Sequence, residues 1–172
     1  MSRQETIIIP SKTDIGALGN RINSETRKCH ERINKEMAIK FPVAISEPKV
    51  YRQGIQMFYH IFKAIEDSLS EEVNKNTHYS DMLRKIWRPE LSRTERLHKD
   101  LMLFYGGRPA KFESPILKKQ IQSTEHIRQI AIERPYLLLA YMHVLYLALF
   151  AGGQFMYPKV AQSKKLFPGA SS

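Results

Sequence analysis

This sequence of 172 residues lacks the common motifs for disulfide, nucleotide and zinc sites. A single cysteine, Cys29, excludes an internal disulfide framework and suits a reducing, intracellular compartment. There is no glycine-rich loop after a strand, no Cys-x-x-Cys and no His-Glu-x-x-His, and the six histidines are scattered without metal-ligand spacing. The first residues carry no signal-peptide pattern. The sequence therefore contains no conventional nucleotide, zinc or disulfide motif.

Charge and composition place the chain among globular proteins with an excess of cations. The hydrophobic content of 42% and the charged content of 26% are ordinary, and the net charge is +10. Such a charge permits nucleic acid, an anionic membrane surface, an acidic protein or a carboxylate-bearing ligand as a partner. The basic residues are spread along the chain, so we expect no nucleic-acid partner.

The periodicity predicts an all-α fold. Only the segment Thr6–Ile9 alternates like a strand, and we expect an extended arm over residues 1–10, one helical domain over residues 11–168 and a tail over residues 169–172. A first helix is predicted over about residues 13–40. Its expected buried stripe consists of Leu18, Ile22, Cys29, Ile33 and Met37.

A second line on this helix joins Asn23, Arg27 and His30 at spacings of four and three residues, so these side chains share one face. One interpretation is a solvated helix flank. The other is an iron-binding imidazole with a cation one turn away, placed to meet an anionic group of a cofactor. The residue types alone do not choose between the two.

The most apolar stretch, residues 135–154, contains His143 and ends with Gly152 and Gly153. It is long enough to span a membrane, but an ionisable residue in its middle favours the central, buried helix of a bundle. Adjacent glycines inside a helix are costly, which suggests that something approaches the backbone closely. Two acidic pairs in the preceding sequence, Glu66-Asp67 and Glu71-Glu72, are predicted to be solvated charges.

Three stretches resemble the heme oxygenase family. Residues 26–34 are similar to the segment that supplies the family's proximal histidine, and residues 58–66 to its Tyr-His-Ile-Tyr-x-Ala-Leu-Glu segment. Residues 146–154, Tyr-Leu-Ala-Leu-Phe-Ala-Gly-Gly-Gln, look like its distal-helix signature, Tyr-Leu-Gly-Asp-Leu-Ser-Gly-Gly-Gln. Order and separation fit, and the pattern is most like the fungal branch.

The resemblance implies a helical bundle that holds haem b between a proximal helix (about 13–40) and a distal helix (about 135–154), with His30 as the iron ligand. The other implied haem contacts are Asn23, Arg27, His143, Tyr146, Ala148, Leu149, Gly152 and Gly153. Family members use haem as cofactor and substrate and cleave it with O₂ and electrons to biliverdin, CO and ferrous iron. An NADPH-dependent reductase with an acidic surface is the implied electron donor.

The sequence departs from the family at the distal signature, where Leu149 occupies the position of an aspartate that holds a water network. Phe62 and Leu145 replace two further polar members of that network, so we expect a drier pocket. A haem carrier or sensor without turnover is therefore the alternative to an oxygenase, and a helical structural or membrane-surface protein is the third hypothesis. The chain ends before the family's last helices. Membrane attachment, at the cytosolic face of the endoplasmic reticulum, is expected only if a longer protein carries a C-terminal anchor.

Overall fold

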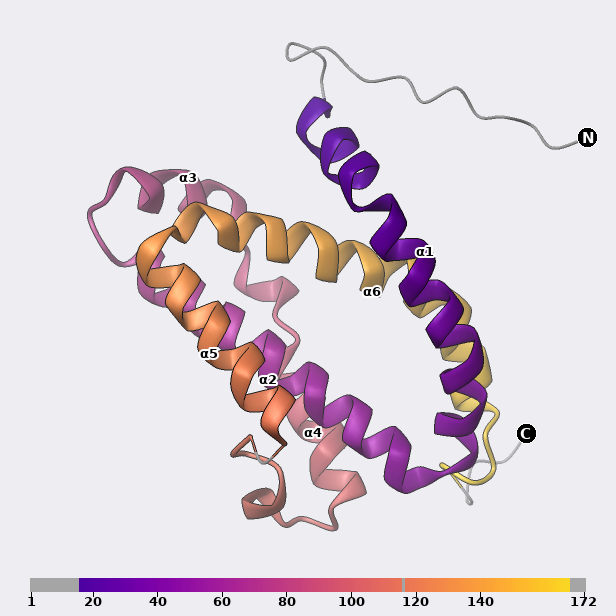
Figure 1. Ribbon diagram of the computed structural model, residues 1–172. Coiled ribbons are helices and arrows are strands. Elements are labelled where there is room, and N and C mark those ends of the chain that lie inside the picture. The colour runs from indigo at the N-terminus through magenta and orange to yellow at the C-terminus, as the bar shows by residue number, and fades with distance from the viewer. Residues whose placement is uncertain (1–15, 116, 168–172) are drawn as a thin grey trace, which may run out of the picture. The chain divides into compact units, whose positions relative to one another are not determined.

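A computed structural model describes residues 16–115 and 117–167 of the chain (Figure 1). Within these residues all regular secondary structure is helical, which confirms the all-α prediction. The chain forms two compact units, Met1–Val43 and Ala44–Ser172, which we describe separately. The predicted arm over residues 1–10 and tail over residues 169–172 lie outside the described residues, and the single domain over residues 11–168 stays a prediction.

The first helix, α1 (Ala17–Ser46), is longer than predicted, because it continues through Pro42 instead of ending at residue 40. A proline inside a helix removes one backbone donor but does not prevent the next turn from forming. One carbonyl at the end of this helix, that of Ile45, accepts a hydrogen bond from Ser163 Oγ at 2.8 Å. The predicted buried stripe is wrong at four of its five positions, because Leu18, Cys29, Ile33 and Met37 are exposed. Ile22 is half-buried. Taken by itself, the smaller unit has no second described helix that could cover this stripe.

Helix α2 (Pro48–Val73) is the centre of the larger unit. It packs against all the other helices of that unit, α3 (His78–Ile86), α4 (Thr94–Phe104), α5 (Lys118–Glu133) and α6 (Leu138–Ala161). Figure 1 shows α2 and α5 running side by side. Short 3₁₀ turns at Pro89–Leu91, Pro109–Lys111 and Pro135–Leu137 precede α4, α5 and α6. The expectation that the apolar run 135–154 forms the central element is therefore wrong.

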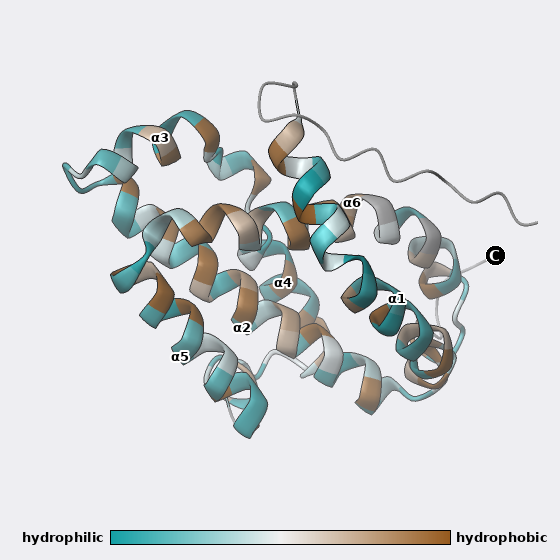
Figure 2. Cartoon of the chain, turned by 45° about the horizontal axis from the view of Figure 1, so that its top comes forward, coloured by the Kyte–Doolittle hydropathy of each residue, from teal (hydrophilic) through white to brown (hydrophobic). Residues whose placement is uncertain are grey.

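Two apolar clusters make up the core of this unit. The larger one joins α2 to the helices around it through Phe62, Ile65, Leu69, Leu83, Trp87, Ile127, Leu138, Met142 and Tyr146. The smaller one consists of Tyr59, Leu101 and Phe112. Apolar and polar residues alternate along the helices at helical spacing (Figure 2), as expected for amphipathic helices packed on one another.

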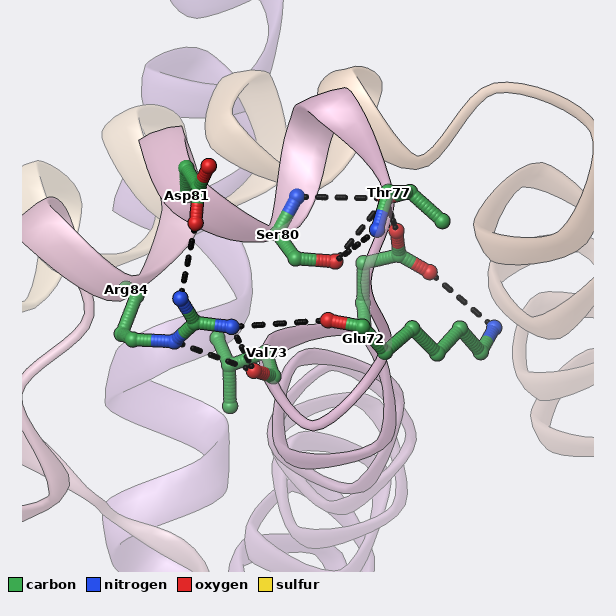
Figure 3. A network of polar contacts seen from close by, with 7 residues as sticks. Glu72, Val73, Thr77, Ser80, Asp81 and Arg84 are labelled. Atoms are coloured by element: carbon green, nitrogen blue, oxygen red, sulfur yellow. Dashed lines mark hydrogen bonds and ion pairs between the residues drawn. The ribbon is translucent and has the colours of Figure 1, made fainter.

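The corner between α2 and α3 is fixed by a network of polar contacts (Figure 3). Glu72 is 2% exposed and accepts a hydrogen bond from Thr77 Oγ1 at 2.6 Å. Thr77 also caps α3 through the backbone N–H of Ser80, and Arg84 Nη2 donates to the carbonyl of Val73 at 2.8 Å. The prediction of solvated charge is thus wrong for Glu72, because the tight corner brings donors to its carboxylate.

Helix α6 extends past Gln154 to Ala161 and contains Pro158. Among its described side chains, the buried ones are Leu138, Met142 and Tyr146. These three are spaced four residues apart and form one stripe. Phe150, the next position at this spacing, is 47% exposed, and Leu147, on another side of the helix, is 43% exposed. The prediction of burial on nearly every side is therefore wrong for the described side chains. By length and composition alone, Pro135–Gln154 is the one segment of the described chain apolar enough to cross a membrane.

Candidate functional site

The most elaborate polar arrangement of the larger unit surrounds Glu66 of α2, whose side chain is 6% exposed. Its Oε1 accepts hydrogen bonds from the backbone N–H of Arg93 and from the hydroxyl of Tyr146, both at 2.7 Å. Its Oε2 accepts from Ser92 Oγ and from the backbone N–H of Thr94, the latter at 3.1 Å. One carboxylate therefore ties α2 to the start of α4 and to the middle of α6.

The surroundings of Glu66 keep it ionised. Burial by itself opposes ionisation, but the hydrogen bonds from Ser92, Thr94, Arg93 and Tyr146 outweigh it and hold the pKa of Glu66 below its usual range. Burial, followed by the hydrogen bond to this carboxylate, raises the pKa of Tyr146, so its hydroxyl stays a donor.

The sequence predicted that Glu66 is a solvated charge, so this buried role of its carboxylate was missed. A usable signal existed. Glu66 follows Ile65 directly and lies four residues after Phe62, so that the carboxylate sits beside the most apolar stripe of α2. A carboxylate at such a position needs several donors to compensate for lost hydration.

The three apolar replacements predicted from sequence lie against one cluster. Phe62 is 2% exposed, and its ring meets that of Tyr146 edge to face, with centroids 5.2 Å apart. Leu145 and Leu149 are half-buried and pack against the same cluster. The inner side of the distal helix is therefore apolar at these positions, next to the hydrogen bond between Tyr146 and the carboxylate of Glu66.

The candidate haem contacts on α1 lie in one row along the helix. His30 is half-buried, whereas Asn23 and Arg27 are exposed. Arg27 Nε lies 3.4 Å from Glu31 Oε1, an exposed pair of the kind that contributes little to stability. These three residues belong to the smaller unit and the distal residues to the larger one, so their meeting around one ligand stays a prediction.

On α6, the glycine pair leaves open space for a ligand. A Cβ built on Gly153 would meet nothing within 4 Å, and one on Gly152 would meet only Met156 Cε, at 4.0 Å. Neither glycine has a positive φ. Packing and backbone conformation within the described residues thus give no reason for the helix-weakening pair, whereas a flat group lying against the backbone would.

The other predicted contacts on α6 have different surroundings. Tyr146 is buried and hydrogen-bonded to Glu66, so its hydroxyl is committed inside the unit. His143 is half-buried and Ala148 is exposed. In the described part of the chain, no three His, Cys, Asp or Glu side chains gather into a metal site.

Comparison with known proteins gives a consistent assignment. The model of the family described as heme oxygenase matches residues 16–171. The chain is 36% identical to the heme-binding protein HMX1 of Saccharomyces cerevisiae, with 98% of this chain and 57% of that protein covered. It is 31% identical to a heme oxygenase of Rhodella violacea, with 85% and 60% covered. The chain thus spans between half and two thirds of the length of these relatives.

Two solved structures are similar over most of the chain. A heme oxygenase from Leptospira interrogans superposes with a TM-score of 0.74 at 27% identity, covering 88% of this chain and 72% of the other. Heme oxygenase-1 from the cyanobacterium Synechocystis sp. PCC6803, solved in complex with heme, gives 0.70 at 27% identity, covering 85% and 63%. The chain belongs to the heme oxygenase family.

Proposed function

We propose that this protein binds haem b through His30 and degrades it to biliverdin, CO and ferrous iron with O₂ and electrons from a reductase. The observation that carries the proposal is the glycine pair on α6. Its Cβ positions open onto free space, and it occurs in a chain whose family model matches residues 16–171. A planar macrocycle is the kind of ligand that needs such an approach to backbone.

Each residue has a separate task in this proposal. His30 would hold the haem iron through an imidazole nitrogen, and the glycine pair would let the macrocycle lie close to the backbone of α6. Arg27 pairs with a propionate and exchanges its exposed partner Glu31 for it. Asn23 and His143 offer hydrogen bonds to the propionates. When bound, haem supplies the redox chemistry that activates O₂ and is itself the substrate.

A second candidate function is haem binding without turnover. It is favoured by the apolar cluster that receives Phe62, Leu145 and Leu149, because these side chains cannot hold the water that would deliver protons. The name of the relative from Saccharomyces cerevisiae, heme-binding protein, is compatible with either function. The two candidates share the haem site and differ only in proton supply.

Titration with hemin tests the shared site. We expect the purified chain to give a saturable Soret band with one equivalent of hemin, and His30→Ala to shift or weaken that band. His126→Ala, which removes an exposed histidine from α5, is the matched control and should leave the band unchanged. A Soret band that is indifferent to His30→Ala would refute the ligand assignment.

Turnover then separates oxygenase from carrier. After anaerobic reconstitution, O₂ and a reductant should bleach the Soret band and yield a bile pigment. A haem spectrum that survives many equivalents of reductant would favour the carrier instead. In that case Leu149→Asp should restore turnover if the missing carboxylate is the cause, and failure of this variant with intact haem binding would exclude that explanation.

The proposal extends to partner and compartment. The excess of positive charge suits an NADPH-dependent reductase with an acidic surface, and reducing power of this kind is available in the cytosol, where a free Cys29 also persists. We propose a cytosolic location, at the face of the endoplasmic reticulum if the protein is anchored there. Fractionation of cells that express the tagged protein tests this location.

A further inference from the structure

One long side of α1 carries four cations for which the described residues offer no ion-pair partner. At about 100° per residue, four cations fall within an arc of about 60° on this helix. These residues, which we call the basic stripe, are Arg21, Lys28, Arg32 and Lys35. All four are exposed, and none of them forms an ion pair with a residue that the structure describes.

Cations elsewhere on the same helix differ. Arg27 lies 3.4 Å from Glu31, and Lys40 lies 2.7 Å from Glu36, so each is partly neutralised by a carboxylate four residues away. Both fall outside the arc of the basic stripe. The stripe is therefore a local concentration of positive charge along about 21 Å of helix, with no acidic residue inside its arc and with Glu25 about 20° beyond its edge.

Apolar side chains accompany the basic stripe. Ile39, four residues after Lys35 and within the same arc, is 74% exposed, and Leu18, three residues before Arg21, is 68% exposed. Figure 2 shows α1 as a largely hydrophilic helix with a few separate apolar positions. A ligand that offers only negative charge would leave Ile39 in water. A surface with anionic groups above an apolar layer would use the cations and Ile39 together.

The basic stripe also points away from the candidate haem row. The centre of its arc lies about 180° around the helix from His30. A partner on the stripe would therefore leave His30 and Arg27 accessible to haem. The two surfaces are independent by geometry.

We infer that the basic stripe of α1 binds the anionic headgroups of a phospholipid membrane, with Ile39 reaching the boundary of the acyl layer. Clusters of four or more Lys and Arg side chains on a helix are attracted to anionic lipids, and this attraction lies within a Debye length of the surface. The stripe orients the protein with the haem row of α1 facing away from the membrane. This binding requires no membrane-spanning helix.

Vesicle flotation with the full chain tests the inference. We expect binding to vesicles of phosphatidylcholine with phosphatidylserine, none to vesicles of phosphatidylcholine alone, and loss of binding at high salt. Each removed cation should weaken binding about fivefold, so changing all four residues of the stripe to Gln should weaken it on the order of several hundredfold. Ile39→Gln should weaken binding severalfold without changing its salt dependence.

A matched control separates the stripe from the overall charge. Changing four exposed cations of the larger unit, Lys85, Lys111, Lys118 and Lys119, to Gln removes the same charge and should leave most binding intact. Equal losses in the two variants would overturn the inference, as would a wild-type chain that ignores anionic vesicles at low salt but binds an acidic polypeptide through the stripe. Circular dichroism and hemin titration of both variants verify that they are folded and keep the haem site.

Discussion

Removing the charge of Glu66 should weaken the larger unit more than any other single change to a carboxylate in it. In Glu66→Gln the carbonyl oxygen can still accept from Arg93 N–H and Tyr146 hydroxyl, and the Ser92 hydroxyl can turn to accept. The N–H of Thr94 then faces an amide N–H, because it donates to Oε2 in the wild type at 3.1 Å. Losing one bond to a charged acceptor and weakening the others costs about 2–4 kcal/mol.

A double-mutant cycle isolates the link to α6. Tyr146→Phe removes one of four donors and leaves the carboxylate three, so we expect a loss of about 1.5 kcal/mol. Combined with Glu66→Gln, the losses should be less than additive by about 1 kcal/mol, because both changes weaken the same bond. Urea unfolding followed by circular dichroism measures each value.

Glu71→Gln is the control, since Glu71 lies five residues further along the same helix and is exposed. This change should alter the free energy of unfolding by less than about 0.5 kcal/mol. Strictly additive losses for Glu66→Gln and Tyr146→Phe would refute the direct bond. An effect of Glu66→Gln as small as that of Glu71→Gln would refute the buried network as a whole.

The hydrogen-bond network of Glu66 also makes the free energy of unfolding depend on pH. The pKa of Glu66 is lower in the folded chain than its usual value of about 4.3, so its stabilisation is complete above that value and disappears as the pH falls through the lower, folded pKa. Wild type should therefore lose stability faster than Glu66→Gln below about pH 4.3. The pKa of Glu72 is lowered as well, against the effect of burial, by hydrogen bonds from Thr77 and Lys75, but this contribution is common to both proteins.

Two further predictions concern single residues. Gly153→Ala should raise the free energy of unfolding of the haem-free protein by about 1 kcal/mol, because the added Cβ meets nothing within 4 Å. The same variant should bind hemin more weakly in the Soret titration. A variant that gains stability and keeps full affinity for hemin would contradict the role of the glycine pair. His60 is 3% exposed, and its Nε2 has no hydrogen-bond partner among the described residues. Burial, with Arg128 nearby, lowers the pKa of His60 despite the hydrogen bond that its ring donates to the Phe112 backbone. Folding therefore becomes less favourable as the pH falls below about 6.5, and urea unfolding at neutral and mildly acidic pH should show a smaller change for His60→Asn than for wild type.

The sequence was enough to predict the fold class and the two helices near residues 13–40 and 135–154. Helix α2 begins at Pro48 and ends at Val73, because a proline suited to the first turn and a polar break bound a strongly periodic stretch. The family, too, was accessible from sequence, since the segments around His30 and Gly152-Gly153 keep their order and spacing. Local patterns of this kind need no knowledge of what packs against them.

Tertiary structure decided how charged and apolar side chains are used. The position of Glu66 beside an apolar stripe hints at burial, but only the donors that α3, α4 and α6 bring to Glu66 and Glu72 make the burial of these carboxylates favourable. The same holds for α6: its composition predicts burial all around, but a single stripe through Met142 is covered by α2 and α5. Burial depends on which surfaces meet across long stretches of chain, whereas helix formation depends on neighbours a few residues away.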